Sequence, residues 1–295
     1  EIIGKAMANR ERVSKREQMW IDATNASQKE SDGKKRKAIL LKAYHDISAK
    51  FPNDLEAKAF LALQMYRNVK SKKNYAAIEK LIANILEKNP RHPCHHYRIH
   101  LWDYKDPKQA VPSIGQCGQA SPSIAHMWHM PGHIFSRLKR YNDAAWQQEA
   151  SARVDHAHMI RDRVMPDQIH NFAHNNEWLI RNLIFVGRVE DALDLAKNMT
   201  ELPRHPKYNT VTKRGSAFYG RQRLFQVLNT YEMWDELIKL SGTRYLRPTE
   251  NFAEQIKRER YLGAAYFRTG KTEQGNEQLA MLEGQLSDLK GKQQK

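Results

Sequence analysis

The chain has 295 residues and a formal net charge of +16, from 49 lysines and arginines against 33 aspartates and glutamates. No stretch approaches the roughly 18 consecutive apolar residues of a membrane-spanning helix, so the sequence predicts no membrane span. The basic excess would suit an anionic partner, but the lysines and arginines are scattered and do not alternate with aromatic residues. We therefore expect a solvated basic surface and no nucleic-acid binding.

The two cysteines, Cys94 and Cys117, are too few for a four-cysteine zinc site. They form either one disulfide, which favours a periplasmic or secreted protein over a cytoplasmic one, or two unpaired thiols. The sequence opens at Glu1 without a methionine, so we expect a processed or truncated piece. A fused or associated upstream domain is therefore one of the partners that the sequence allows.

Apolar residues recur with helical spacing along almost the whole chain. In residues 55–69, Ala59, Leu63 and Tyr66 fall on one stripe, and prolines and glycines mark the breaks between such segments. The predicted helices, in chain order, are 36–50; 54–69 paired with 75–88; 93–104 with 107–119; 123–138 with 142–160; 167–186 with 189–200; 214–229 with 232–240; and 253–268 with 272–288. No strand-like alternation competes with this pattern, so the sequence predicts an all-α fold.

A similar phrase recurs at the turn inside several of the predicted helix pairs. It reads Lys-Arg-Tyr-Asn-Asp-Ala-Ala at 139–145, Gly-Arg-Val-Glu-Asp-Ala-Leu at 187–193 and Gly-Lys-Thr-Glu-Gln-Gly at 270–275. A helix-pair unit of about 34 residues with such a turn resembles the tetratricopeptide repeat. The resemblance implies a right-handed superhelix (an α-solenoid) of about six helix pairs in one continuous domain. The expected parts of this 1–295 domain are N-terminal helices in 1–50, histidine-bearing repeats in 51–200 and C-terminal repeats in 201–295.

More narrowly, the chain resembles a histidine-bearing bacterial subgroup of tetratricopeptide proteins. The matching motifs are His92-Pro93 followed by His-Tyr-Arg-Ile-His at 96–100, Ala-His-Met-Trp-His-Met-Pro-Gly-His-Ile at 125–134, and His174-Asn175. The resemblance supports the fold and implies no particular activity. The function therefore has to be argued from the histidines themselves.

Three histidine pairs have the four-residue spacing that stacks two side chains on one helix face: His96/His100, His129/His133 and His170/His174. His126 lies one turn before the middle pair. Imidazole is a common ligand of transition metals, and two imidazoles stacked in this way form a chelating unit. Pro131-Gly132 interrupts the middle pair, and a kink there would move its imidazoles out of register.

The three pairs fall on the predicted first helices 93–104, 123–138 and 167–186. In tetratricopeptide proteins the first helices line the concave face, so the resemblance implies a shared groove. Packed helices lie about 8–10 Å apart, so neighbours can share one ion, whereas the outer two, roughly 16–20 Å apart, cannot. We therefore predict either one metal site centred on His129 and His133 and completed by neighbouring pairs, or two sites side by side.

Copper is the favoured metal, ahead of iron and zinc. The donor set is rich in nitrogen, and the soft thioethers of Met127 and Met130 suit copper, although they point off the histidine stripe and also fit a core. The carboxylates of Asp155, Asp167 and Glu177 would instead complete an iron site with two histidines, or orient the ligands. Three histidines with an open coordination position would also suit zinc.

Three residues are candidates for catalysis, with no role assigned to any of them: Asp155, His156 and Glu177. His156 and His158 lie in a mixed-charge insert that forms either a lid over the groove or an exposed segment. The walls of the groove, and its contacts with a small-molecule or peptide substrate, are assigned to Tyr97, Trp102, Trp128, Asn175 and Trp178.

Two functional hypotheses follow. In the first, the protein binds a transition metal in the groove and is a copper- or iron-dependent oxidoreductase or a metal carrier. In the second, it is a non-catalytic scaffold that binds peptides or proteins, and the histidines are groove-lining contacts. The basic charge would then select acidic partner segments. The metal content of the purified protein separates the two hypotheses.

Overall fold

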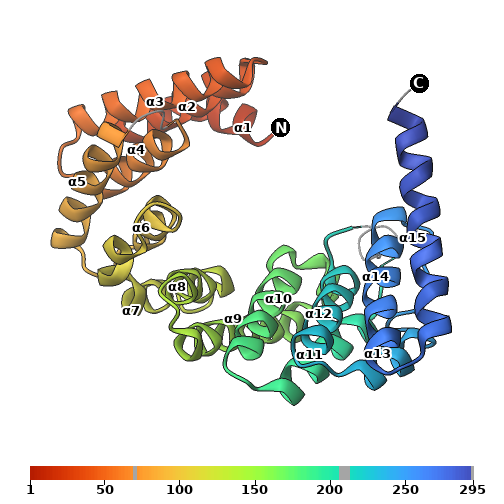
Figure 1. Ribbon diagram of the computed structural model, residues 1–295. Helices are drawn as coiled ribbons and strands as arrows, with labels where there is room; N and C mark the ends of the chain where they lie inside the picture. Colours follow the sequence, from red (N-terminus) through yellow and green to blue (C-terminus); the bar gives the residue numbers. More distant parts are fainter. Residues whose placement is uncertain (69–71, 206–212, 294–295) are drawn as a thin grey trace. The chain divides into compact units, whose positions relative to one another are not determined.

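The computed structural model describes residues 1–68, 72–205 and 213–293 (Figure 1). Within these ranges it contains fifteen α-helices, three short 3-10 helices and no strand. Helices that follow one another in sequence pack together within each compact part of the chain, as in an α-solenoid. The predicted all-α fold is therefore confirmed. None of the described helices combines the length and the apolarity that crossing a membrane requires.

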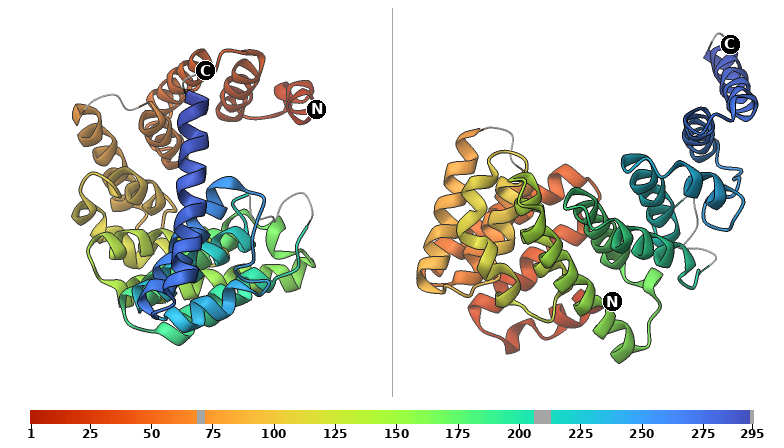
Figure 2. Two further views of the ribbon diagram at one scale, coloured as in Figure 1. Left: turned by 45° about the vertical axis from the view of Figure 1, so that its right-hand side comes forward. Right: turned by 60° about the horizontal axis from the view of Figure 1, so that its bottom comes forward.

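The chain divides into two compact units, residues 1–122 (unit 1) and 123–295 (unit 2). The helices of unit 1 are α1 (Ile2–Ala8), α2 (Lys15–Lys29), α3 (Gly33–Lys50), α4 (Leu55–Arg67), α5 (Lys72–Lys88), α6 (His95–Trp102) and α7 (Val111–Ala120), with η1 (Arg10–Arg12) and η2 (Pro107–Ala110). Those of unit 2 are α8 (Ala125–Arg137), α9 (Tyr141–Asp162), α10 (His170–Phe185), α11 (Val189–Glu201), α12 (Ser216–Thr230), α13 (Trp234–Ser241), α14 (Phe252–Arg268) and α15 (Thr272–Gln293), with η3 (Pro166–Gln168). Figure 2 gives two further views of the helices. The single continuous domain and the right-handed superhelix of six pairs stay predictions.

The observed helices begin and end within a few residues of the predicted ones. The helix predicted at 253–268, for example, is observed as α14, Phe252–Arg268. The helix predicted at 167–186 is instead split, because η3 ends at Gln168 and α10 begins at His170. Residue 69, at the end of the predicted helix 54–69, lies outside the described residues. Helices α1 and α2 precede the first helix whose bounds were predicted.

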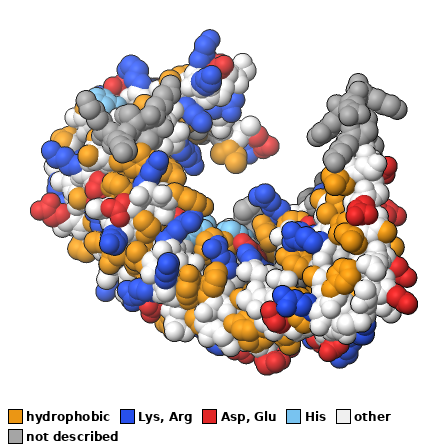
Figure 3. All heavy atoms as spheres, viewed as in Figure 1, with side chains coloured by type: hydrophobic (Ala, Val, Ile, Leu, Met, Phe, Trp, Pro, Cys, Tyr) orange, Lys and Arg blue, Asp and Glu red, His pale blue; other side chains and the backbone are white. Residues whose placement is uncertain are grey.

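Basic side chains are spread over the molecular surface. Figure 3 shows lysine and arginine side chains over both units, mixed with acidic and hydrophobic ones. Many of the basic side chains pair with a nearby carboxylate, as Arg188 does with Glu149 and Asp191 at 2.9 and 2.6 Å. This distribution is what a solvated basic surface requires.

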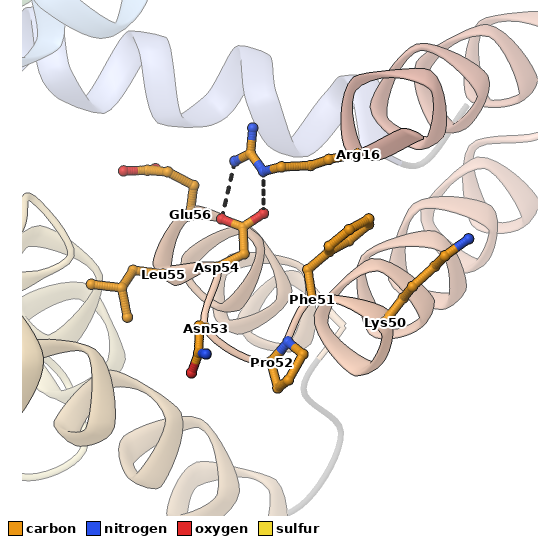
Figure 4. A pocket seen from close by; sticks show the side chains of 8 residues that line it. All are labelled: Arg16, Lys50, Phe51, Pro52, Asn53, Asp54, Leu55 and Glu56. Atoms are coloured by element: carbon orange, nitrogen blue, oxygen red, sulfur yellow. Dashed lines mark hydrogen bonds and ion pairs between the residues drawn. The ribbon is translucent and has the colours of Figure 1, made fainter. Parts of the chain in front are cut away.

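In unit 1, Asp54 marks the start of α4. Its carboxylate accepts a hydrogen bond from the backbone N–H of Ala57 at 3.1 Å, which caps the helix. The same carboxylate accepts two hydrogen bonds from the Arg16 guanidinium of α2, at 2.5 and 3.0 Å (Figure 4). Burial raises the pKa of Asp54, but these hydrogen bonds outweigh burial and lower it overall. Asp54 therefore ends the predicted break at 51–54 and ties α4 to α2.

Four helix pairs of unit 2 share one turn geometry. The turn residue has a positive φ in each pair: Lys139 (60°), Gly187 (79°), Glu232 (52°) and Gly270 (73°). The backbone N–H of the next residue then donates to the carbonyl five residues before it, at 2.8 to 3.0 Å. This bond closes the first helix of each pair. Three of these turns carry the phrase predicted at 139–145, 187–193 and 270–275, and the turn at Glu232 is a fourth.

Helix α10 is held from several sides. It packs against α8, α9, α11 and α12, and the apolar core of unit 2 includes Ile180 and Leu183 of this helix. At the neighbouring contact between α11 and α12, a Cβ on Gly220 would lie 2.8 Å from the carbonyl oxygen of Ala196. The two backbones can approach this closely only because residue 220 is a glycine. Helix α10, which carries His174, therefore packs against two helices, α11 and α12, that are themselves in close contact.

Candidate metal centre

Helix α8 brings His129 and His133 together. His129 is fully buried and His133 is 8% exposed. Their ring centroids lie 4.6 Å apart and their Nε2 atoms 2.7 Å apart. Pro131 lies inside α8 between them, and the helix continues past it to Arg137. The imidazoles remain adjacent, so Pro131 does not separate the pair.

The imidazole of His129 is oriented by Gln148 of α9. Gln148 Nε2 donates to the carbonyl oxygen of His129 at 3.2 Å, so its Oε1 is the atom that accepts from His129 Nδ1 at 2.6 Å. The proton of His129 is therefore on Nδ1, and its Nε2 carries the lone pair that faces His133. Gly132 makes room for this contact, because a Cβ there would lie 2.3 Å from Gln148 Nε2.

His174 of α10 joins the pair from the neighbouring helix. Its ring centroid is 4.7 Å from that of His129 and 6.1 Å from that of His133. Its Nδ1 lies 3.4 Å from Glu177 Oε1, one turn further along α10. Glu177 also pairs with Arg223 of α12, whose Nε donates at 3.0 Å. Burial raises the pKa of Glu177, but the hydrogen bonds from His174 and Arg223 outweigh it and lower the pKa, so the carboxylate stays ionised.

His129, His133 and His174 form what we call the histidine cluster. Each ring offers one nitrogen, and these three nitrogens all lie within 4.8 Å of one another. Two imidazole ligands of a tetrahedral ion, each about 2.0–2.1 Å from it, have nitrogens about 3.3 Å apart. The observed spacing brackets this value, so side-chain movements on the order of 1 Å would bring the three nitrogens onto one ion.

Aromatic rings and burial surround the middle histidines of the cluster. Trp178 stacks on His133 with ring centroids 4.1 Å apart, and His126 stacks on His129 at 5.5 Å. Burial lowers the pKa of His129 well below 6.5, and the nearby His133 and His174 lower it further. A neutral imidazole is the form that binds a metal. His129 therefore presents a lone pair, and not a positive charge, at neutral pH.

The other predicted ligands are distributed over both units. His96 and His100 lie on α6 in unit 1, with ring centroids 4.5 Å apart. His126 lies in unit 2 beside His129. His170 is the first residue of α10, and its side chain lies outside the described residues. From the predicted outer pairs, the structure places one residue, His174, against His129 and His133.

The candidate catalytic residues differ in their surroundings. Asp155 is 5% exposed and accepts a hydrogen bond from Asn175 Nδ2 at 2.6 Å. Burial raises the pKa of Asp155 to about 6, although Asn175 acts in the opposite direction. His156 is exposed on α9, whereas Glu177 touches His174 directly.

The predicted groove residues belong to both units. Tyr97 and Trp102 pack in unit 1, where Trp102 Nε1 donates to Glu79 at 2.8 Å. Trp128 of unit 2 lies edge-on to Trp146, with ring centroids 6.3 Å apart. Trp178 stacks on His133 of the histidine cluster. Asn175 contacts Asp155.

The two cysteines are unpaired and buried. Burial raises the pKa of each thiol to about 12, so both remain protonated at neutral pH. A protonated buried thiol is neither a nucleophile nor a ready metal ligand. Of the two states that the sequence left open, the structure shows the two free thiols.

Sequence reasoning missed Gln148, Gly132 and Arg223. Gln148 is a fully buried amide on a helix, which is a signal that it serves another polar group. Gly132 was considered only as part of a kink, and its role in admitting Gln148 depends on how α9 packs on α8. Arg223 lies 46 residues after Glu177, so no local spacing connects the two.

A pocket of about 370 Å³ adjoins the histidine cluster in unit 2. It is lined by Pro166, Asp167, Ile169, Ala173, His174, Arg214, Gly215 and Tyr219. His174 therefore belongs both to the histidine cluster and to the wall of this pocket. Its side chain is 34% exposed, whereas His129 and His133 are buried.

Comparisons with known proteins add little about function. No family model matches the chain, and no curated protein matches it. Among solved structures, the chain is similar to BtubC (BKLC) from P. vanneervenii, with a TM-score of 0.42 and 13% sequence identity. The match covers 86% of this chain and 90% of that chain. Similarity at this level does not bear on function.

Proposed function

We propose that the histidine cluster binds one transition-metal ion and that the protein acts through this ion, as a metal-dependent enzyme or a metal carrier. The observation that carries the proposal is the convergence of three imidazole nitrogens, from α8 and α10, to within 4.8 Å of one another. Burying the polar rings of His129 and His133 costs solvation free energy that apolar side chains would not lose. Metal binding offsets that cost.

Two outer contacts support the proposal. Metal-binding histidines commonly donate their second ring N–H to a carbonyl or carboxylate oxygen, which fixes the tautomer and the ring orientation. Gln148 Oε1 accepts from His129, and Glu177 Oε1 accepts from His174. Three nitrogen ligands also leave an open coordination position, which a water or a substrate would occupy.

Copper remains the first candidate for the metal. Among the first-row divalent ions, Cu²⁺ binds nitrogen ligands most tightly, and zinc also accepts a three-nitrogen set. An iron site with two histidines and a carboxylate would draw on Glu177, but Arg223 already holds that carboxylate. Met127 and Met130 are buried, so we give their thioethers no part in the choice.

We also propose that the helix pairs are tetratricopeptide repeats. The recurring turn supports this, because it combines the phrase seen in the sequence with one backbone geometry in four successive pairs. In such a solenoid α8, α10 and α12 are equivalent first helices. The histidine cluster and Arg223 would then share one face of the repeat array.

The proposal is tested by measuring the metal content of protein purified without a histidine tag. We expect bound copper or zinc in the wild-type chain, and an affinity at least tenfold lower in His174→Gln, which removes one ligand without emptying the buried interior. His45→Gln is the matched control, because His45 is 73% exposed on α3 and should bind metal like the wild type.

A different result would favour the peptide-binding scaffold. Metal-free protein, whose melting temperature does not change when Cu²⁺ or Zn²⁺ is added, would overturn the proposal. Equal metal binding by His174→Gln and the wild type would show that the metal does not bind at the histidine cluster. The histidines would then be contacts in a groove that holds a partner segment.

A further inference from the structure

The pocket beside His174 is larger than a metal ion needs. Its volume of about 370 Å³ lies in the range of small-molecule sites. Residues around η3 and the first turn of α10 form one side, and the start of α12 forms the other. Because His174 is the partly exposed member of the histidine cluster, a ligand in this pocket would lie against the open side of the metal.

Arg214 supplies the positive charge in this pocket. Its exposed side chain makes no ion pair with any other residue that the structure describes. Burial raises the pKa of the neighbouring phenol of Tyr219, and the charge of Arg214 acts in the opposite direction. The nearby carboxylates have other partners, although Asp167 Oδ1 is buried without a hydrogen bond. Glu177 is held by Arg223 and His174, and Asp167 accepts the backbone N–H of His205 at 2.6 Å. The charge of Arg214 is therefore left for a ligand.

The charge balance selects a carboxylate over a phosphate. One guanidinium matches one carboxylate in charge and offers it two parallel N–H donors. A phosphate dianion would bring a second negative charge toward the carboxylates of Asp167 and Glu177, which is unfavourable. Pro166, Ile169 and Ala173 make the opposite wall apolar, so it suits a hydrocarbon body.

We propose that this pocket binds a small organic carboxylate, with its charged end on Arg214 and Tyr219 and its body beside His174. This inference rests on the proposed function, because it makes the ligand a substrate or co-ligand of the metal at the histidine cluster. Arg214 and Tyr219 are then binding residues. Glu177 and Arg223 position the metal ligand His174.

Benzoate is a suitable probe, because it joins one carboxylate to an apolar ring, and benzamide is its neutral counterpart. The experiment loads the full chain with Cu²⁺, measures the copper content, and titrates each probe by calorimetry while following the visible spectrum of the copper. We expect saturable benzoate binding that changes the copper spectrum and no comparable binding of benzamide. Loss of a charged hydrogen-bond partner typically costs about 1.5–3 kcal/mol, so Arg214→Gln should weaken benzoate binding roughly 10- to 100-fold.

Lys213→Gln is the matched control. It removes the same charge from the adjacent residue, which does not line the pocket, and should change the benzoate affinity by less than about twofold. Equal weakening by both variants, or equal binding of benzoate and benzamide, would overturn the pocket assignment while the copper content upholds the proposed function. A chain that takes up no copper would overturn the proposed function, and this inference with it.

Discussion

At the scale of single residues, His129 is the member of the histidine cluster for which the structure gives a partner for both ring nitrogens. It is fully buried, its Nδ1 donates to Gln148, and its Nε2 lies 2.7 Å from His133 Nε2. In the metal-free protein His133 Nε2 must carry a proton, because His129 Nε2 carries a lone pair and two lone pairs at this distance repel. A metal ion would replace that proton. Metal binding at the cluster therefore moves this proton to the other nitrogen of His133, Nδ1.

Gly132→Ala tests the contact between Gln148 and His129. An alanine Cβ would lie 2.3 Å from Gln148 Nε2. Gln148 is fully buried, so its side chain cannot relieve the clash by moving into solvent. We expect the free energy of unfolding to fall by about 1–3 kcal/mol. The metal affinity should fall about 10- to 100-fold, as is usual when the orienting partner of a metal ligand is lost. Urea unfolding and metal competition titrations measure the two effects.

Gly115→Ala is the control for this substitution. Gly115 also lies within a helix, α7, but a Cβ there has nothing within 4 Å. Replacing it should stabilise the protein by up to about 1 kcal/mol, because alanine has the higher helix propensity. If Gly132→Ala behaves like Gly115→Ala in both measurements, the Gln148 contact does not orient His129.

Asp155→Asn tests the cost of a buried carboxylate. Burial raises the pKa of Asp155 to about 6, above the 3.8 of an exposed aspartate. The folded state therefore binds more protons than the unfolded state between these values, and stability is lost as pH rises from about 4 to about 6. The full shift corresponds to about 3 kcal/mol as an upper limit. The substituted amide keeps an oxygen that accepts from Asn175 and carries no charge.

We expect Asp155→Asn to be more stable than the wild type at pH 7.5 by about 1–3 kcal/mol. The advantage should shrink as the pH falls through about 6 to about 4, where folded Asp155 becomes protonated and no longer carries a buried charge. Urea unfolding of the two proteins at several pH values gives this difference directly. A difference in stability that is the same at pH 4.5 and pH 7.5 would show that the charge of Asp155 is not the cause.

At the scale of helices, the boundaries in unit 2 were predictable because each is set locally. Turns at Gly187 and Gly270 need a positive φ, which glycine adopts readily, and the phrase that follows begins the next helix. The turn at Glu232 has the same geometry without a glycine, so the recurring phrase did not reveal it. Helix α2 was also not predicted, although Ser14 and Glu17 form a capping box at its start.

The histidine cluster was only partly predictable, because local spacing fixes one helix face but not the packing between helices. Four-residue spacing shows that His129 and His133 share a face of α8, and spacing between packed helices shows that a neighbour can reach them. The choice of His174 as that neighbour depends on the offset between α8 and α10, which no local pattern encodes. Gln148 and Arg223 depend on helix packing in the same way, across 19 and 46 residues of sequence.

At the scale of the whole molecule, the net charge of +16 does not account for the histidine cluster. The charge is distributed over both units, whereas the cluster lies wholly in unit 2. Scattered surface charges contribute little to any one site, because each is screened within about 8–10 Å at physiological ionic strength. Arg214 and Arg223 matter for this site because they lie beside His174 and Glu177, and not because the protein is basic.

This separation predicts where metal binding stabilises the chain. At a free metal concentration of 100 times Kd, binding should stabilise the folded site by about 2.7 kcal/mol. We expect amide hydrogen exchange to slow in α8, α9 and α10, which carry the cluster and Gln148, and to stay unchanged in α2 to α5, which hold no residue of it. His174→Gln should abolish the slowing in α8 to α10. Equal slowing in α2 to α5, or the same slowing in His174→Gln, would show that the metal acts on the protein elsewhere.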